Sequence, residues 1–106
     1  MKIFFDHCVT KPFRKALPQH TVKTAREMGC EGLKNGLFLA RAQAAGFEVF
    51  LTVDQNLRYQ QNLQGRSIAV VVLIANGITL EDLLPLAPAL ENTLAQIQPG
   101  QLYEVR

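Results

Sequence analysis

The sequence has few cysteines, few histidines and no long apolar run, and each shortage excludes a class of protein. Cys8 and Cys30 are the only cysteines in 106 residues, which argues against a disulfide scaffold and favours free thiols in a reducing compartment. Two histidines are also present, but the spacing of positions 7, 8, 20 and 30 does not match a zinc site. The longest apolar run, Ile68 to Ala75, is too short to cross a bilayer.

Other absences further narrow the kinds of protein that this sequence can encode. No low-complexity segment, internal repeat or linker interrupts the chain, so residues 1–106 are expected to form a single domain. With 48% hydrophobic and 19% charged residues, the chain can bury a core. Asp6 interrupts the apolar start too early for a signal peptide. We therefore expect a cytoplasmic protein without a membrane segment.

Apolar runs rich in β-branched and aromatic residues alternate with helical patterns along the chain. Thr10 is expected to cap the first helix, and Thr79 with Asp82 resembles a capping box. Pro85 and Pro88 predict that the C-terminal helix is split. The patterns predict strands at residues 2–5, 20–24, 49–53, 68–74 and 102–105, helices at 10–17, 35–45 and 79–97, and a short helix or ordered loop at 57–63.

Strands that alternate with helices predict a three-layer α/β/α sandwich around a mainly parallel sheet. The run from Ile68 to Ile74 is apolar on both faces, as in the central strands of such sheets. The segment from Leu102 to Val105 is expected to be an edge strand. A parallel sheet brings the exits of its strands to one edge, where ligands bind in open α/β folds.

Carboxylates follow three of the expected strands, at Asp6, Glu27 and Asp54. Each has a simpler explanation, because Asp is a favoured helix N-cap and acids are common in solvated loops. Carboxylates that share one cleft repel each other unless a cation neutralises them, and Mg²⁺ or Mn²⁺ takes oxygen ligands of this kind. Such an ion activates water and stabilises the oxyanions of a phosphodiester under attack. One interpretation of the three acids is therefore metal-dependent phosphodiester hydrolysis.

Positive charge gathers in the N-terminal part of the chain. Residues 1–66 carry ten Lys and Arg and five Asp and Glu, a net charge of +5, whereas residues 67–106 carry one and four, a net charge of −3. This asymmetry is compatible with a nucleic-acid ligand. Arg26, Lys34 and Arg58 flank the acidic segments and are candidates for phosphate contacts, or else solvated surface charges. His7 is a candidate proton carrier or phosphate ligand beside Asp6, or else an exposed residue at a strand end.

Two other α/β classes fit less well. A phosphoacceptor receiver domain places two adjacent acids after its first strand, but here Asp6 is followed by His7 and Cys8. It also needs a Lys after a later strand, whereas Ile74 is followed by Ala and Asn. A Rossmann module needs a Gly-rich loop after its first strand, and this sequence has none there. A nucleophilic role for Cys8 lacks a dedicated base.

Four segments together resemble PIN-like domains, and especially a PIN-like family of unknown function linked to toxin–antitoxin loci. In the last of them, Thr52-Val53-Asp54 is similar to the family's hallmark of a strand that ends Thr-X-Asp. The resemblance implies a small α/β/α sandwich and an RNA-cleaving, divalent-metal-dependent nuclease, the toxin half of a toxin–antitoxin pair. It also implies a homodimer. The segments are residues 4–9, 24–29, 35–42 and 51–57.

The resemblance also assigns site residues. Asp6, Glu27 and Asp54 match three of the family's four acidic positions, Asn35 stands at the helix-start position, and Leu37 stands where relatives place a Glu. These matches imply a Mg²⁺ or Mn²⁺ ion held by Asp6, Asp54, Glu27 and Asn35. Because Asn offers an oxygen but no negative charge, such a site would hold its cation more weakly than a four-acid site. The alternative is a module that binds nucleic acid or a partner protein, such as a cognate antitoxin, without cutting.

Overall fold

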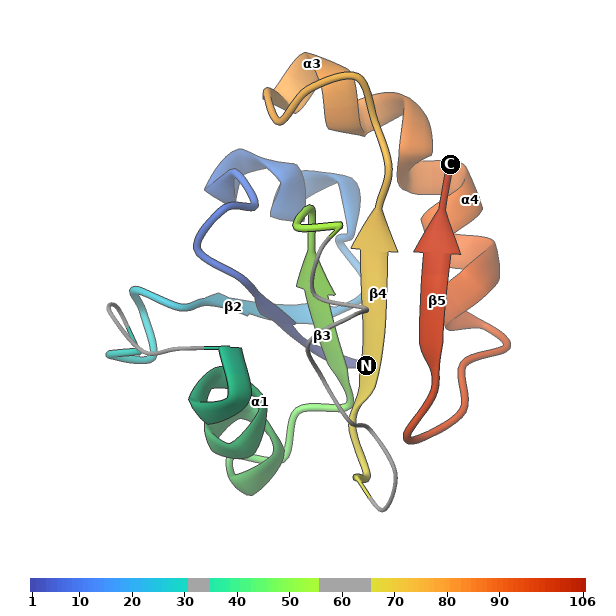
Figure 1. Ribbon diagram of the computed structural model, residues 1–106. Helices are drawn as coiled ribbons and strands as arrows, with labels where there is room; N and C mark the ends of the chain where they lie inside the picture. The colour runs from blue at the N-terminus through green and yellow to red at the C-terminus, as the bar shows by residue number, and fades with distance from the viewer. Residues whose placement is uncertain (31–34, 56–65) are drawn as a thin grey trace.

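Five parallel strands form the central sheet among the residues that the structure describes (Figure 1). The computed structural model describes residues 1–30, 35–55 and 66–106. The predicted α/β class with a parallel sheet is confirmed, and so is the edge position of the last strand. The spatial order is β2-β1-β3-β4-β5, with β1 at Lys2–Phe5, β2 at Thr21–Thr24, β3 at Val49–Thr52, β4 at Ala69–Leu73 and β5 at Leu102–Val105.

Helical segments cover both faces of this sheet. One face packs against the 3₁₀-helix η1, the helices α3 and α4 and the short 3₁₀-helix η2, and the other packs against α1 (Figure 1). None of the helices that the structure describes is long and apolar enough to cross a membrane. Their bounds are Lys11–Ala16 for η1, Asn35–Ala44 for α1, Leu80–Leu83 for α3, Leu84–Leu86 for η2 and Ala87–Leu94 for α4.

Alternation along the strands divides the core between the two faces. On β1, Phe5 faces η1 and lies 6.2 Å from Phe13, measured between ring centroids. Phe4 points the other way, toward α1, and stacks on Phe50 at 5.7 Å. Phe47 packs edge-on against Phe4 at 5.3 Å. Every residue of β4 is buried, as expected for a strand that is covered on both faces.

The first helix differs from the sequence-based expectation. Residues 11–16 form a 3₁₀-helix rather than an α-helix, and the Thr10 side chain makes no capping hydrogen bond. The segment closes i→i+3 bonds instead, from the Phe13 amide to the Thr10 carbonyl and from the Leu17 amide to the Arg14 carbonyl. Residues 6–20 connect β1 to β2, and short 3₁₀ pieces are frequent in such connectors.

The C-terminal helical region agrees with the prediction from its prolines. Thr79 and Asp82 form the reciprocal capping box that begins α3. The chain then passes through a 3₁₀ turn at Pro85 before α4 begins, so the helix is split as expected. The predicted short helix or loop at 57–63 lies outside the described residues.

Truncation of the aromatic core gives a test of this packing. We expect Phe50→Ala to lower the free energy of unfolding by about 3–5 kcal/mol, because it removes a fully buried ring from the stack with Phe4. Urea denaturation followed by circular dichroism measures the loss. Ile78→Ala is the control: Ile78 is 58% exposed, so its loss should be below about 1 kcal/mol. Equal losses in the two variants would contradict this account of the core.

Candidate functional site

The strand order creates a switch point between β1 and β3. The connection from β1 leads outward to β2, whereas the next strand, β3, lies on the other side of β1. η1 and α1, which make these two connections, pack on opposite faces of the sheet. In open α/β sheets a crevice forms outside the carboxyl ends of the strands at such a point, and ligands bind there. The residues that follow Phe5 and Thr52 therefore define the candidate site.

Asp6 follows β1 directly and lies at the switch point between β1 and β3. Its backbone amide donates to the Leu51 carbonyl at 2.9 Å, so the residue continues the β1–β3 ladder by one step. Its side chain is 3% exposed. One carboxylate oxygen accepts the Thr52 hydroxyl at 2.8 Å, and the other accepts the His7 amide at 2.8 Å. These donors fix the orientation of a buried carboxylate, and hydrogen bonding makes its burial tolerable.

The Thr52 hydroxyl joins the ends of the two strands. It donates to Asp6 and accepts the Asp54 amide at 3.0 Å, while the residue itself is fully buried. A hydroxyl that accepts the amide two residues later is a local turn motif of Ser and Thr. The Thr-X-Asp spacing thus has a physical function here. It ties the start of the segment that follows β3 at Val53 and Asp54, which we call the Asp54 loop, to the Asp6 carboxylate.

His7 and Cys8 complete the surroundings of Asp6. The Nδ1 atom of His7 lies 2.9 Å from the Asp6 carboxylate, and the imidazole is 65% exposed. The Cys8 thiol donates to the same carboxylate at 3.3 Å and lies 3.5 Å from the Thr52 hydroxyl. Burial raises the pKa of the Cys8 thiol, which keeps it protonated and a hydrogen-bond donor. A protonated thiol is a poor nucleophile.

Glu27 lies at the exit of β2 and is held by positive charge. Its carboxylate accepts the Thr24 amide at 2.9 Å and pairs with Arg14 at 3.0 Å, and Lys11 lies 3.7 Å away. In return, the Glu27 amide donates to the Thr24 hydroxyl at 3.2 Å. The hydrogen bond from the Thr24 amide, together with Arg14 and Lys11, lowers the pKa of Glu27 from 4.5 to about 2.

The structure therefore separates the expected site residues into groups. Asp6 and Asp54 follow neighbouring strands and are joined through Thr52, whereas Glu27 is engaged by cations of η1 and by the Thr24 amide. Arg26 is exposed beside Glu27. Within the described ranges, no three or more His, Cys, Asp or Glu side chains are grouped so that they could hold a metal ion. Lys34, Arg58 and the side chain of Asn35 lie outside the described residues.

Asp6 and Asp54 can still be tested as a donor set for a divalent ion. Mg²⁺ keeps several waters and is commonly bound through one or two carboxylates together with the phosphates of its substrate. Two carboxylates from adjacent strand ends, one of them oriented by Thr52, fit that pattern. Ligating carboxylates are themselves usually hydrogen-bonded, as Asp6 is. Both Asp6 oxygens are engaged, by Thr52 and Cys8 on one side and by His7 on the other, so Asp6 would have to release a contact to bind an ion.

Sequence reasoning missed Lys11 and Arg14. They are three residues apart, and side chains at that spacing eclipse each other on a 3₁₀-helix. Both therefore reach Glu27 from η1. The only signal in the sequence is the pair of basic residues at this spacing, which places both side chains on one face of a helix of either type.

Comparisons with known proteins leave the family open. No family model, no curated protein and no solved structure matches the chain. The resemblance to PIN-like domains thus stays a prediction from four short segments, and the functional assignment depends on the chemistry of the site.

The depressed pKa of Glu27 predicts a specific dependence of stability on pH. The ionised form is stabilised in the folded state, so this contribution is present above pH 4.5 and is lost as the pH falls toward 2. Because the ion pair is partly exposed, we expect a contribution of about 1 kcal/mol. Glu27→Gln should therefore reduce the difference in urea midpoint between pH 6 and pH 3. Glu104→Gln, a change at an exposed acid on β5, is the control, and an unchanged difference in Glu27→Gln would refute the assignment.

A second prediction concerns the hydroxyl that joins β1 to β3. Thr52→Val keeps the shape of the side chain but removes one hydrogen bond to the buried Asp6 carboxylate and one from the Asp54 amide. We expect a loss of about 1.5–3 kcal/mol in the free energy of unfolding, since hydrogen bonds to charged groups are of this size. Thr52→Ser retains the hydroxyl and should lose clearly less. Chemical denaturation at neutral pH measures both, and equal losses would show that packing, not the hydroxyl, is what matters.

Proposed function

We propose that this protein is a PIN-like, metal-dependent ribonuclease and the toxin component of a toxin–antitoxin pair. The observation that carries the proposal is the buried Asp6 carboxylate, joined through Thr52 to the start of the Asp54 loop at the switch point of a parallel sheet. A buried carboxylate that hydrogen bonds hold in one orientation at the crevice of a parallel sheet is a candidate ligand-binding group. The toxin assignment depends on the resemblance of the sequence.

In this proposal each residue of the site has a defined part. Asp6 and Asp54 hold Mg²⁺ or Mn²⁺, and Thr52 fixes the direction of the Asp6 carboxylate. The ion, when bound, supplies activation of water and stabilisation of the phosphodiester oxyanions. Glu27 positions Arg14 and Lys11 through its ion pairs rather than binding the ion itself.

The distribution of charge supports RNA as the substrate. Lys11 is 57% exposed on η1, and Arg26 and His7 are exposed near the exits of β2 and β1. Phosphate contacts by such side chains supply affinity and position without reading sequence. We assign Lys11, Arg26 and His7 to the RNA backbone, together with Lys34 and Arg58 from the sequence prediction.

A non-catalytic module that binds nucleic acid or a partner protein is the second candidate. Two observations favour it: Glu27 is already neutralised by Arg14 and Lys11, and Asp6 is bonded to Thr52, His7 and Cys8. To reach an ion, Asp6 would have to release some of these contacts. An antitoxin protein or a second copy of the chain is the expected protein partner in this case.

Cleavage of single-stranded RNA in the presence of Mn²⁺ or Mg²⁺ distinguishes the two candidates. Asp6→Asn and Asp54→Asn should each lower the cleavage rate by about a hundredfold or more, because even changes next to metal ligands cost up to that factor. Both variants keep the size of the residue, but Asp6→Asn turns one of two accepting oxygens into a donor that faces Thr52 and Cys8 or His7, so circular dichroism must show an intact fold before its rate is compared. Glu104→Gln is the control for loss of one acid away from the site and should cleave normally.

Each outcome of this assay has a clear consequence. Cleavage that survives both Asp variants would sink the site assignment. Absence of cleavage and of Mn²⁺ binding in the wild type, with RNA binding retained in EDTA, would leave the binding module as the function. That residual binding should weaken steeply with salt if phosphates dominate it.

A further inference from the structure

Helix α1 is apolar on two opposite sides, although only one of them packs against the sheet. Leu39 and Ala42 are fully buried in the core cluster that contains Phe4 and Phe50. The opposite side faces solvent, and α1 stands apart from the other helices that the structure describes (Figure 1). The exposed residues on this side, which we call the outer stripe, are Leu37, Ala40, Arg41 and Ala44.

The composition of α1 is that of a helix covered on both sides. Asn35, Arg41 and Gln43 are its only polar residues, and a helix that is apolar nearly all round is normally buried. Leu37 is nevertheless 56% exposed. Residues of the outer stripe recur at i, i+3, i+4 and i+7, the spacing with which a helix packs against a neighbour. The outer stripe thus has the pattern of a packing surface, but no second helix among the described residues covers it.

The outer stripe is also grooved. Leu37 and Arg41 form one row of residues four apart along the helix, and Ala40 and Ala44 form the adjacent row. Because the methyl side chains of the second row are short, a hollow of about 410 Å³ opens over the stripe, lined by these four residues. Helices pack by placing a row of this kind on one helix into the groove beside such a row on the other. The hollow therefore has the form that receives a helix.

Arg41 indicates the charge of the helix that would dock there. Its guanidinium makes no hydrogen bond or ion pair with another described residue, whereas Arg14 pairs with Glu27 at 3.0 Å. α1 contains no acidic residue that could pair with it. A charge that is taken out of water in an interface is costly unless an opposite charge meets it, and the planar guanidinium suits a carboxylate best. A helix that covers the outer stripe should therefore bring a carboxylate to Arg41.

We propose that the outer stripe docks an amphipathic helix of a partner protein, one that carries carboxylates beside its apolar residues. A second copy of this chain is a poorer occupant, because a symmetric contact brings the same patch of both copies together. The two Arg41 side chains would then meet in a contact to which α1 contributes no acid. Nucleic acid is also a poorer occupant, since phosphate binding takes several cations and the outer stripe has one. The inference goes beyond the proposed nuclease activity and does not depend on it.

Two synthetic peptides test this docking surface. Both are about 20 residues long, so that they form helices on their own, and both repeat Leu at i, i+3, i+4 and i+7. One peptide carries Glu at the positions that flank the Leu stripe, and the other carries Lys there. We expect the Glu peptide to shift the ¹⁵N–¹H signals of residues 35–44 and to bind at least about fivefold more tightly than the Lys peptide, the effect of one ion pair. Equal affinities, no binding of either peptide, or shifts confined to other residues would overturn the inference.

Two pairs of variants at exposed positions locate the contact. Arg41→Glu should reverse the preference in favour of the Lys peptide, whereas Arg106→Glu makes the same change of charge after β5 and should leave the preference as it is. Leu37→Ala should weaken binding of the Glu peptide about tenfold, as expected for the loss of one leucine side chain from an interface. Leu84→Ala, at an exposed leucine of η2, should bind that peptide like the wild type. A preference for Glu that persists in Arg41→Glu would refute the acidic partner.

Sedimentation equilibrium without peptide tests the second copy as occupant. We expect the outer stripe to hold no two copies together, so that Leu37→Ala leaves the measured mass unchanged. A wild-type dimer that Leu37→Ala dissociates would show that another copy covers the stripe, and the proposed occupant would then be wrong. Failure here is distinct from failure of the nuclease proposal: a protein that cleaves no RNA but binds the Glu peptide on α1 loses only its nuclease assignment.

Discussion

The hydrogen bond from the Thr52 hydroxyl to the Asp6 carboxylate is the interaction on which the site depends. A carboxylate that is 3% exposed is tolerable only when donors surround it, and Thr52 is the donor that comes from the neighbouring strand. The same hydroxyl receives the Asp54 amide. One side chain thereby stabilises a buried charge, joins the ends of β1 and β3, and sets the start of the Asp54 loop.

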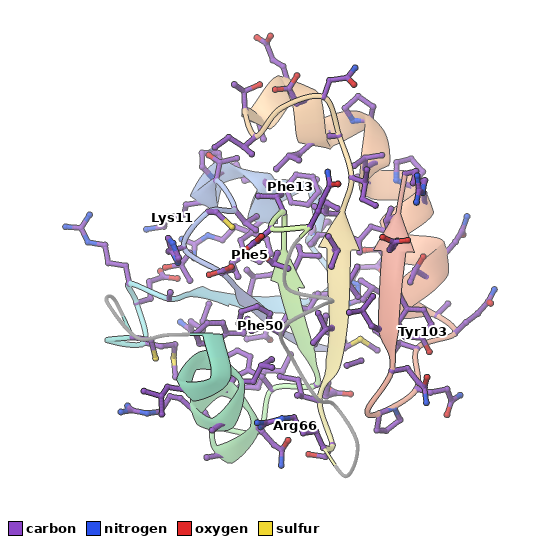
Figure 2. All side chains as sticks on the ribbon, in the orientation of Figure 1. Phe5, Lys11, Phe13, Phe50, Arg66 and Tyr103 are labelled. Atoms are coloured by element: carbon purple, nitrogen blue, oxygen red, sulfur yellow. The ribbon has the colours of Figure 1, made fainter. Side chains whose placement is uncertain are left out.

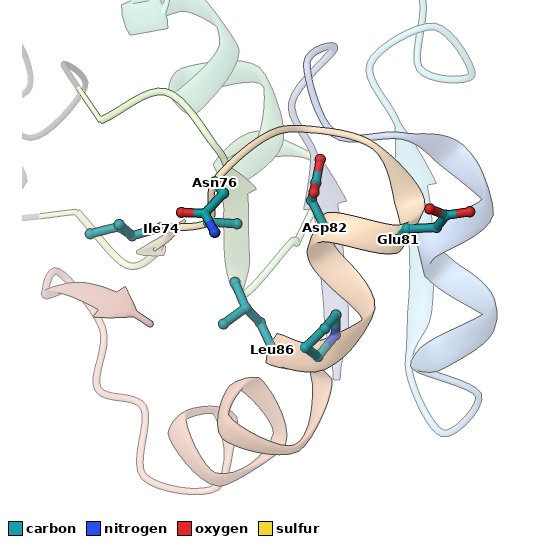
Figure 3. A pocket seen from close by; sticks show the side chains of 7 residues that line it. Ile74, Asn76, Glu81, Asp82 and Leu86 are labelled. Atoms are coloured by element: carbon teal, nitrogen blue, oxygen red, sulfur yellow. The ribbon is translucent and has the colours of Figure 1, made fainter.

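The second constraint is electrostatic and lies at the exit of β2. Glu27 could act as a metal ligand only at the expense of its bonds to Arg14, Lys11 and the Thr24 amide, which together hold its pKa near 2. Its present partners make it a fixed counter-charge that holds η1 against the end of β2. As a result Lys11 and Arg14 of η1 gather at the exit of β2 (Lys11 is labelled in Figure 2), and a hollow opens at the exit of β4 against α3 and η2 (Figure 3).

Much of the fold was predictable because it depends on local patterns. β1 and β5 have the predicted bounds, and the capping box at Thr79 and the break at Pro85 were correctly assigned. The 3₁₀ form of residues 11–16 was not predicted, since the same residues suit either helix type. In the site, the pairing of Asp6 with the end of β3 followed from parallel strands, whereas the ion pairs of Glu27 did not.

The sequence alone determined the class of fold, the strand ends on which Asp6 and Asp54 stand, and the Thr-X-Asp spacing, because alternation, capping and turn chemistry act over a few residues. Only the tertiary structure decided which groups meet. The order β2-β1-β3 places Thr52 beside Asp6, the 3₁₀-helix aims Lys11 and Arg14 at Glu27, and the exit of β4 shares a hollow with α3. These contacts join residues far apart in the chain, and their geometry depends on how the sheet is wound, which no local pattern encodes.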